Sequence, residues 1–522
     1  MKQLFFIFFI TSFQYAVAQH QNIKISDINS PEEPSICLNY FNPQYIVAGA
    51  NIRSYYYSND GGLTWNRNIL NSTYGIWGDP CVISDRNGDF YFFHLSDPQE
   101  ANFLDRIVCQ KSTDNGKTWN NGSYMGLNGS KDQDKHWVAI DFSNNYMYAT
   151  WTQFDVYGSG WESDKSNILF SISKDNGETW SEAVRINELS GDCLDSDNTT
   201  EGAVPAVGPN GEIYVTWAFN NKIYFDRSYD RGETWLEHDI EVATQPEGWD
   251  YAIPGIYRSN GLPITCCDTS HSAYRGTIYV NWTDQRNGID NTDVWLAKST
   301  DKGNTWSSPI KVNNDTTKSQ QFLTWMTIDQ TNGYLYFVFY DRREREHNSL
   351  LTDVYMALSK DGGKTFTNFK ISESPFLPRN DVFFGDYNNI TAYNNVVRPI
   401  WTRLNYSDTE NGLSIWTALV NTEIIGHEDD NNFLIAEEIT YPNPTNNLSF
   451  YSFKIRQKTT VSLYLYDSYG RVVKKIIDNK NLGIGKYIEK IDIKAENLTS
   501  GLYMYVLTYD NNSKVKKLIV EN

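Results

Sequence analysis

Six copies of one eight-residue motif constrain the fold of this chain more than any other feature. Each copy follows a segment rich in β-branched and aromatic residues, such as SNILFSI or TDVYMAL, so each is expected to be the turn of a β-hairpin. In such a turn an aspartate accepts backbone N–H bonds, and a glycine supplies a positive φ that other residues resist. The motif aspartates are therefore expected to be structural and not catalytic. The copies are SNDGGLTW from 58, STDNGKTW from 112, SKDNGETW from 173, SYDRGETW from 228, STDKGNTW from 299 and SKDGGKTF from 359.

A second signature precedes each motif and consists of a first strand, a short turn and an aromatic second strand. Examples are DPCVISDRNGDFYFFHL from 79 and DKHWVAIDFSNNYMYATWTQF from 134. The signature occurs seven times, and the motif copies lie about 54 to 71 residues apart, the length of one propeller blade with variable loops. The sequence therefore predicts an all-β, seven-bladed β-propeller, with a six-bladed ring as the alternative. Residues 22–26, NIKIS, are expected to supply the missing outer strand that closes the ring.

The chain divides into four predicted segments. Residues 1–18 have the basic, apolar and small-residue order of a secretory signal peptide. The propeller is expected over 19–425 and an acidic linker over 426–440. A small β-sandwich is expected over 441–522, where 13 basic residues stand against 7 acidic ones. The formal net charge of −19 for the whole chain argues against a nucleic-acid partner, because phosphate backbones are bound by clustered Lys and Arg.

Both parts of the chain resemble known families. The six turns are similar to the S-x-D-x-G-x-T-W Asp-box of sialidase-like BNR-repeat propellers. The C-terminal residues resemble the type IX secretion sorting domain (type A) in YPNP at 441–444, D-x-x-G-R-V at 467–472 and G-x-Y at 501–503. The second resemblance implies export across an outer membrane, the secretion machinery as a partner, and a secreted or cell-surface location.

The loops at one face of such a propeller hold the candidate site residues. Loops that lead into the first strand of each unit, and loops that follow the second strand, are expected to open on the same face. The predicted catalytic residues are Asp79, Asp134, Glu201, Asp250, Asp386 and Tyr387. The predicted substrate-binding residues are Arg286, Arg342, Arg403 and His136.

Each candidate has a structural alternative. The three arginines match the fork geometry of a substrate carboxylate, but each could instead pair with a carboxylate of its own loop, such as Asp284 or Asp341. The carboxylates could divide acid and base roles, hold Ca²⁺ as the one conceivable cofactor, or be solvated charges that tie blades together. His136 could be a proton shuttle or simply a packed side chain. Trp77, Trp161 and Trp249 are placed in loops where they could stack on sugars, and Cys37 and Cys81 occupy matching positions that could form a bridge between blades.

Three functions remain open at this level. The resemblance implies a secreted glycoside hydrolase of exo-α-sialidase type that acts on acidic glycans or glycoproteins through three arginines, a Tyr nucleophile with a Glu partner, and an Asp acid. The Arg-Ile-Pro motif of that family is absent, and its nearest counterpart is Arg53 in NIRSY. The alternatives are a non-catalytic glycan- or protein-binding propeller, and a two-carboxylate glycosidase on neutral polysaccharide.

Overall fold

The protein is all-β in the computed structural model, which describes residues 20–99, 103–344, 349–404, 412–422, 435–441, 445–455, 457–468, 470–509 and 512–520. These residues form 35 strands, none of them is helical, and so no helix among them could span a membrane. The chain separates into two units, Met1–Thr422 and Glu423–Asn522.

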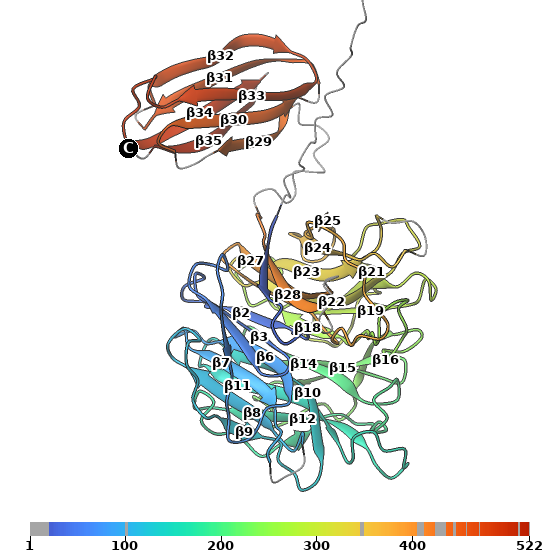
Figure 1. The fold of residues 1–522 in the computed structure, drawn as a ribbon. Helices are drawn as coiled ribbons and strands as arrows, with labels where there is room; N and C mark the ends of the chain where they lie inside the picture. The colour runs from blue at the N-terminus through green and yellow to red at the C-terminus, as the bar shows by residue number, and fades with distance from the viewer. Residues whose placement is uncertain are drawn as a thin grey trace, which may run out of the picture. The chain divides into compact units, whose positions relative to one another are not determined.

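The described part of the first unit consists of seven four-stranded antiparallel sheets, which we number as blades 1 to 7 (Figure 1). The first strands of successive blades contact one another, and the first strand of blade 7 contacts that of blade 1, so the ring is closed around a central channel. The predicted all-β propeller is confirmed. The blades are β2 to β5 (Ser35–Leu38, Ile46–Ala50, Ser54–Ser58, Asn66–Ile69), β6 to β9 (Gly78–Ser84, Phe90–Leu95, Ile107–Ser112, Ser123–Met125), β10 to β13 (Asp132–Asp141, Tyr146–Phe154, Ser166–Ser173, Val184–Arg185), β14 to β17 (Glu201–Val207, Ile213–Phe219, Lys222–Ser228, Ile240–Thr244), β18 to β21 (Ile264–Cys267, Ile278–Asp284, Asp293–Ser299, Ile310–Lys311), β22 to β25 (Gln321–Asp329, Tyr334–Asp341, Asp353–Ser359, Thr367–Lys370), and β26 to β28 (Asn389–Tyr393, Val396–Leu404, Leu413–Leu419) with β1 (Gln21–Ser26).

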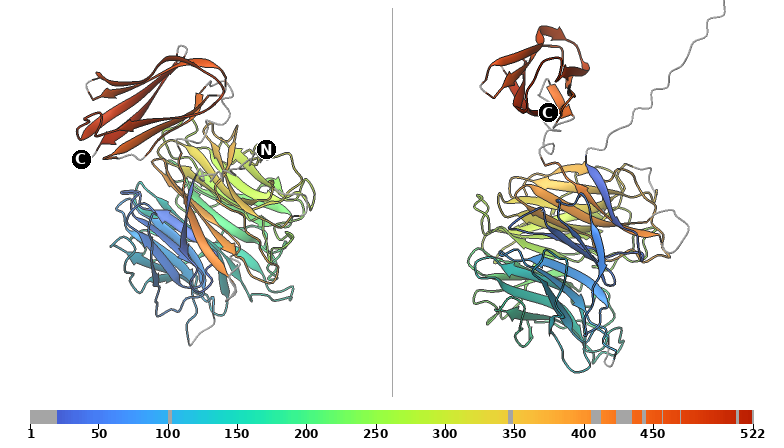
Figure 2. Two further views of the ribbon diagram at one scale, coloured as in Figure 1. Left: turned by 45° about the horizontal axis from the view of Figure 1, so that its top comes forward. Right: turned by 60° about the vertical axis from the view of Figure 1, so that its left-hand side comes forward.

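Blade 7 is completed by the start of the chain. Strand β1 pairs antiparallel with β28 and is the outermost strand of that sheet, as predicted for residues 22–26. Figure 2 shows the blue N-terminal strand beside the orange strands of the last blade. Arg398 of β27 adds a second link, because its Nε donates to the carbonyl of Gly61 in blade 1 at 2.8 Å. The first and last segments of the propeller are therefore held together without a covalent bond.

The six repeated motifs are hairpin turns between the third and fourth strands of blades 1 to 6. In the copy at Asp301, the carboxylate accepts hydrogen bonds from the backbone N–H of Thr305 at 2.9 Å and its hydroxyl at 2.6 Å, while Ser299 accepts from the N–H of Gly303 at 2.8 Å. Gly303 has a φ of 84°. The closing Trp306 packs edge-on against Phe225 of the preceding blade, with ring centroids 5.1 Å apart. The motif thus fixes a turn and joins two blades.

The second unit is a two-sheet β-sandwich with its own core. One sheet contains β29 (Ile435–Tyr441), β30 (Leu448–Ile455) and β33 (Gly485–Asp492); the other contains β32 (Val472–Leu482), β31 (Thr459–Asp467), β34 (Gly501–Tyr509) and β35 (Asn512–Val520). Buried Phe453, Leu463 and Tyr505 belong to the core between them.

The sandwich begins earlier than the predicted boundary at 441. Strand β29 covers residues that the sequence assigned to the linker, and its pairing with β30 shifts register between Ala436 and Ile439. The predicted signal peptide, residues 423–425 at the end of the predicted propeller, residues 426–434 of the predicted linker and 442–444 of the YPNP motif lie outside the described residues.

Candidate functional site

The channel mouth is the end of the ring at which the first strands of the blades begin. In four blades this strand starts with a β-bulge, and the first bulged residue has a positive φ. A bulge re-aims a side chain, and a left-handed conformation at a non-glycine residue is costly unless the surroundings hold it. These residues are Asp79 (53°), Lys135 (48°), Gly202 (75°) and Leu323 (47°).

Lys135 lies at the centre of a buried network of charges at the mouth. Its Nζ is 2.9 Å from Asp386 Oδ2 of the loop before blade 7 and 3.5 Å from Asp79 Oδ2 of blade 2. Arg258, from the loop before blade 5, forms a two-pronged pair with Asp386 and reaches Asp195 Oδ2 at 3.2 Å. The network therefore connects side chains from separate blades across the channel.

The carboxyl groups of the network differ widely in acidity. Burial raises the pKa of Asp134 to about 7. Burial also raises the pKa of Glu201 well above its usual range, and neither carboxyl oxygen has a hydrogen-bond partner in the structure. Burial acts on Asp386 in the same direction, but Lys135 and Arg258 outweigh it and hold its pKa at about 2. Neutral and ionised carboxyls thus coexist near pH 7.

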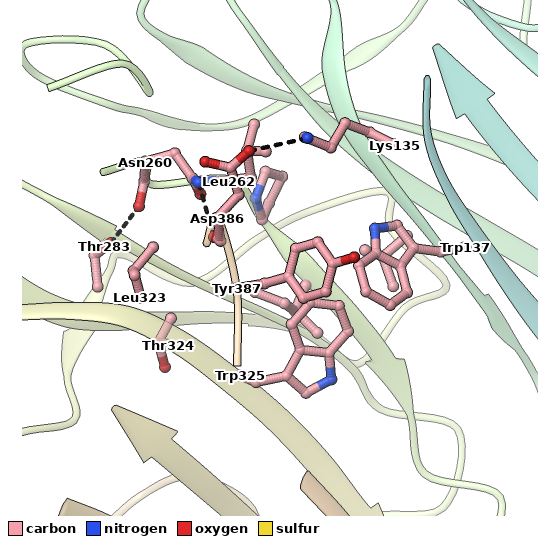
Figure 3. A pocket seen from close by; sticks show the side chains of 14 residues that line it. Lys135, Trp137, Asn260, Leu262, Thr283, Leu323, Thr324, Trp325, Asp386 and Tyr387 are labelled. Atoms are coloured by element: carbon pink, nitrogen blue, oxygen red, sulfur yellow. Dashed lines mark hydrogen bonds and ion pairs between the residues drawn. The ribbon is translucent and has the colours of Figure 1, made fainter. Parts of the chain in front are cut away.

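A narrow pocket opens beside this network (Figure 3). Its aromatic wall is formed by Trp137, Trp325 and Tyr387, and the two indole rings lie 4.4 Å apart between centroids. The Tyr387 hydroxyl is buried and has no hydrogen-bond partner in the structure. The cavity volume of about 20 Å³ is room for about one water molecule, so it can admit a hydroxyl group but not a whole sugar ring.

The three predicted arginines have separate partners, and no hydrogen bond or ion pair among the described residues joins any two of them. Arg286 Nε lies 2.9 Å from Asp284 Oδ1, in the within-loop pairing that the sequence left open. The Arg342 guanidinium is buried against Thr352 and the Pro254 carbonyl. Arg403 donates to Ser374 and lies over Trp416. A shared substrate carboxylate at these three side chains receives no geometric support.

The other predicted residues lie at or near the mouth. Asp79, Asp134, Asp386 and Tyr387 surround Lys135. His136 is buried, which lowers its pKa to about 4 and leaves it neutral at pH 7. Glu201 is fully buried, whereas Asp250 is exposed and its N–H donates to Asp197.

Lys135 and Arg258, the two cations that pair with the carboxylates of the mouth, were not predicted from the sequence. Lys135 could have been predicted, because in DKHW it lies between the predicted site residues Asp134 and His136. Arg258 lies in a long loop without repeat character, and nothing in the sequence marks it.

Two further expectations differ from the structure. Trp249 is buried and donates its indole N–H to the Thr199 carbonyl at 3.4 Å, so only Trp77 and Trp161 of the three tryptophans are exposed. All six cysteines are free. The structure therefore contains no Cys37–Cys81 bridge.

Among the described residues, no group of three or more His, Cys, Asp or Glu side chains has the arrangement of a metal site. The Nζ of Lys135 lies between Asp79 and Asp386, at 3.5 and 2.9 Å from their carboxylate oxygens.

Comparisons with known proteins support the two-part organisation. Residues 439–521 match the family model of the secretion system C-terminal sorting domain, and residues 56–67 match that of the BNR/Asp-box repeat. The predicted resemblances are confirmed: the protein is an Asp-box propeller with a sorting domain of the type IX system, which directs it out of the cell or to the cell surface.

No curated protein matches the sequence. Solved structures with a similar fold include a protein of unknown function from Dyadobacter fermentans (12% identity, TM-score 0.43, 76% of this chain and 96% of that chain). Others are a Hadza microbial sialidase (14%, 0.40, 74% and 75%) and an α-L-arabinanase from Penicillium chrysogenum (15%, 0.39, 68% and 98%). At these scores none of them assigns an activity to this chain.

Proposed function

We propose that the protein is an exported glycan-binding propeller that holds a sugar at the channel mouth. The observation that carries this proposal is the pocket, in which aromatic faces stand beside a buried, unpartnered Tyr387 hydroxyl and the Lys135–Asp386 pair. Sites for small ligands combine an apolar wall with a few converging polar groups in this way. A sugar ring would lie against the partly buried Trp325 and direct one hydroxyl into the cavity.

Hydrolysis of a glycosidic bond is a second candidate function. It is favoured by the difference in acidity between Asp134, with a pKa of about 7, and Asp386, with a pKa of about 2. One carboxyl kept protonated beside one kept ionised is the combination that glycosidases use. Binding without turnover is placed first because both oxygens of Asp386 are already engaged by Arg258.

The test is a screen of the purified full-length protein against immobilised glycans and fluorogenic glycosides, with the variants Tyr387→Phe and Tyr229→Phe. Tyr387→Phe removes only the free hydroxyl, so binding should weaken by about 3- to 10-fold, the value of one neutral hydrogen bond. Tyr229 is exposed beside a hairpin turn on the opposite face, and its variant should bind like the wild type. The proposal is overturned if no glycan binds, or if the two variants behave alike. Turnover of a glycoside would establish the second function.

A further inference from the structure

We infer that the ligand of the mouth is an uncharged polysaccharide chain that runs from the pocket onto the surrounding rim, and not a terminal acidic sugar. This inference rests on the proposed function and adds the class of glycan. Two independent observations carry it: the charges at the pocket and the exposed side chains around it.

The charges at the pocket leave no cation for an acidic ligand. Lys135 is already paired with Asp386 and Asp79, and Arg258 with Asp386 and Asp195. A sugar carboxylate or sulfate placed here would lose its own hydration without gaining an ion pair, and it would lie near Asp79 and Asp386, whose lowered pKa values keep them ionised. A neutral sugar has no such cost. The carboxyl residues of the mouth are Glu32, Glu33, Asp79, Asp134, Asp195, Glu201 and Asp386, against the two cations Lys135 and Arg258.

The rim around the pocket carries exposed aromatic and aliphatic side chains. The rim comprises the loops that lead into each first strand and those that join each second strand to the third. Exposed hydrophobic side chains of this size cost free energy in water and mark interaction sites when they gather on one face. The loops of the opposite face hold fewer: Phe41, Leu63 and Tyr229. Those of the rim include Trp77 (45% exposed), Phe103 (41%), Trp161 (75%), Tyr257 (60%) and Ile289 (70%).

Trp161 is held on an ordered loop instead of a loose one. Its backbone N–H donates to Ser159 Oγ at 3.2 Å, and its carbonyl accepts from the N–H of Asp164 at 3.0 Å. Because the backbone is held here, the loop loses little conformational freedom when the exposed ring meets a ligand.

Hydrogen bonds and ion pairs connect this loop to the pocket. Tyr157 donates its hydroxyl to Asp195 Oδ2 at 2.8 Å, Asp195 pairs with Arg258, and Arg258 pairs with the pocket residue Asp386. Tyr257 precedes Arg258 in the chain. These contacts therefore link two parts of the rim, the Trp161 loop and Tyr257, to the wall of the pocket. Because the cavity admits only one hydroxyl group, a single sugar would leave this surface uncovered, whereas a chain of sugars would cover it.

The experiment compares soluble neutral polymers (arabinan, xylan, mannan and laminarin) with anionic ones (polygalacturonate, alginate and polysialic acid) by affinity electrophoresis of the full-length protein. The variants are Trp161→Ala and, as a matched control on the opposite face, Phe41→Ala. A neutral polymer should bind and the anionic ones should not. Trp161→Ala should weaken polymer binding by about tenfold but leave binding of the corresponding disaccharide unchanged. Phe41→Ala should change neither.

Each other outcome separates this inference from the proposed function. If an anionic polymer binds best and Tyr387→Phe weakens it, the inference fails and the proposed function stands. If no polymer or disaccharide of either charge binds, both fail. If Trp161→Ala instead abolishes a concentration-dependent dimer in sedimentation, the rim binds a second copy of the chain and the inference is overturned.

Discussion

Lys135 decides the chemistry of the mouth at the scale of single residues. Its positive φ places its ammonium between carboxylates of two other blades, where it keeps Asp386 ionised inside the protein. Burial instead raises the pKa of Glu201 well above its usual range and that of Asp134 to about 7. Ionisation of some carboxyls in this network therefore stabilises the folded protein, and ionisation of others destabilises it. The free energy of unfolding must depend on pH as a result.

Glu201→Gln should make the thermal stability less dependent on pH. The pKa of Glu201 is raised in the folded protein, so the unfolded chain releases its proton first and stability falls as pH rises above the ordinary glutamate pKa of about 4.3. The variant and the wild type should melt alike at pH 4, and the variant should melt higher at pH 8. Differential scanning calorimetry across this range measures the gap.

The exposed Glu162→Gln is the matched control and should follow the wild type. Equal pH slopes for Glu201→Gln and the wild type would show that Glu201 is not held neutral. Asp386 has the opposite effect on stability, because its pKa is lowered in the folded protein. Its contribution to stability is present above the unfolded aspartate pKa of about 3.9 and is lost as pH falls toward 2.

Only some of the residues at the mouth could be predicted from the sequence. Asp79, Asp134, Asp386 and Tyr387 were expected at the mouth, because residues that precede a first strand must open on that face, and the structure places them there. Their catalytic roles stay predictions. The direction of Lys135 depends on a left-handed bulge at a residue other than glycine, and no pattern of residue types marks such a conformation.

At the scale of elements, the repeated hairpin turn has one construction in six blades. Hydrogen bonds from the Thr305 hydroxyl and backbone lower the pKa of Asp301 to about 2, which shows how strongly the turn favours the ionised carboxylate. This fold-level feature was readable from sequence because the turn depends on local residue types at fixed offsets, repeated six times. The residue at which the sandwich begins could not be predicted in this way, because β29 is defined by its pairing with β30 further along the chain.

Asp175→Ala should destabilise the propeller without affecting the mouth. Asp175 accepts hydrogen bonds from the N–H and the hydroxyl of Thr179, and the loss of these bonds should cost about 1–3 kcal/mol of unfolding free energy. Chemical denaturation measures the change, and glycan binding per folded molecule should equal that of the wild type. A variant with unchanged stability but lost binding would assign the turn a functional role.

At the scale of the whole molecule, the chain consists of two units with separate cores. The propeller core includes residues from the first, second and third strands of neighbouring blades, while the sandwich core is made of residues of the second unit. The family match at 439–521 gives the second unit its role in secretion. The sequence predicted this division through the change from acidic to basic composition, although it placed the start of the sandwich a few residues late.

Removal of residues 423–522 should leave a folded propeller with the melting temperature it has in the full chain. The reason is that every blade is complete before residue 423, including the closing pair of β1 and β28. Calorimetry of the full-length protein should show two independent transitions, one of which the truncated protein retains. Aggregation of the truncated chain, or a single shared transition, would mean that the two units fold as one.

The most direct test of the account is a crystal structure of the full-length protein with the best-binding oligosaccharide from the screen. We expect one sugar ring against Trp325 at the channel mouth, with a hydroxyl group inside the cavity within hydrogen-bond distance of Tyr387 Oη, and further sugar units directed onto the rim. Sugar density on the hairpin-turn face or on the C-terminal sandwich, with the mouth pocket empty, would contradict it.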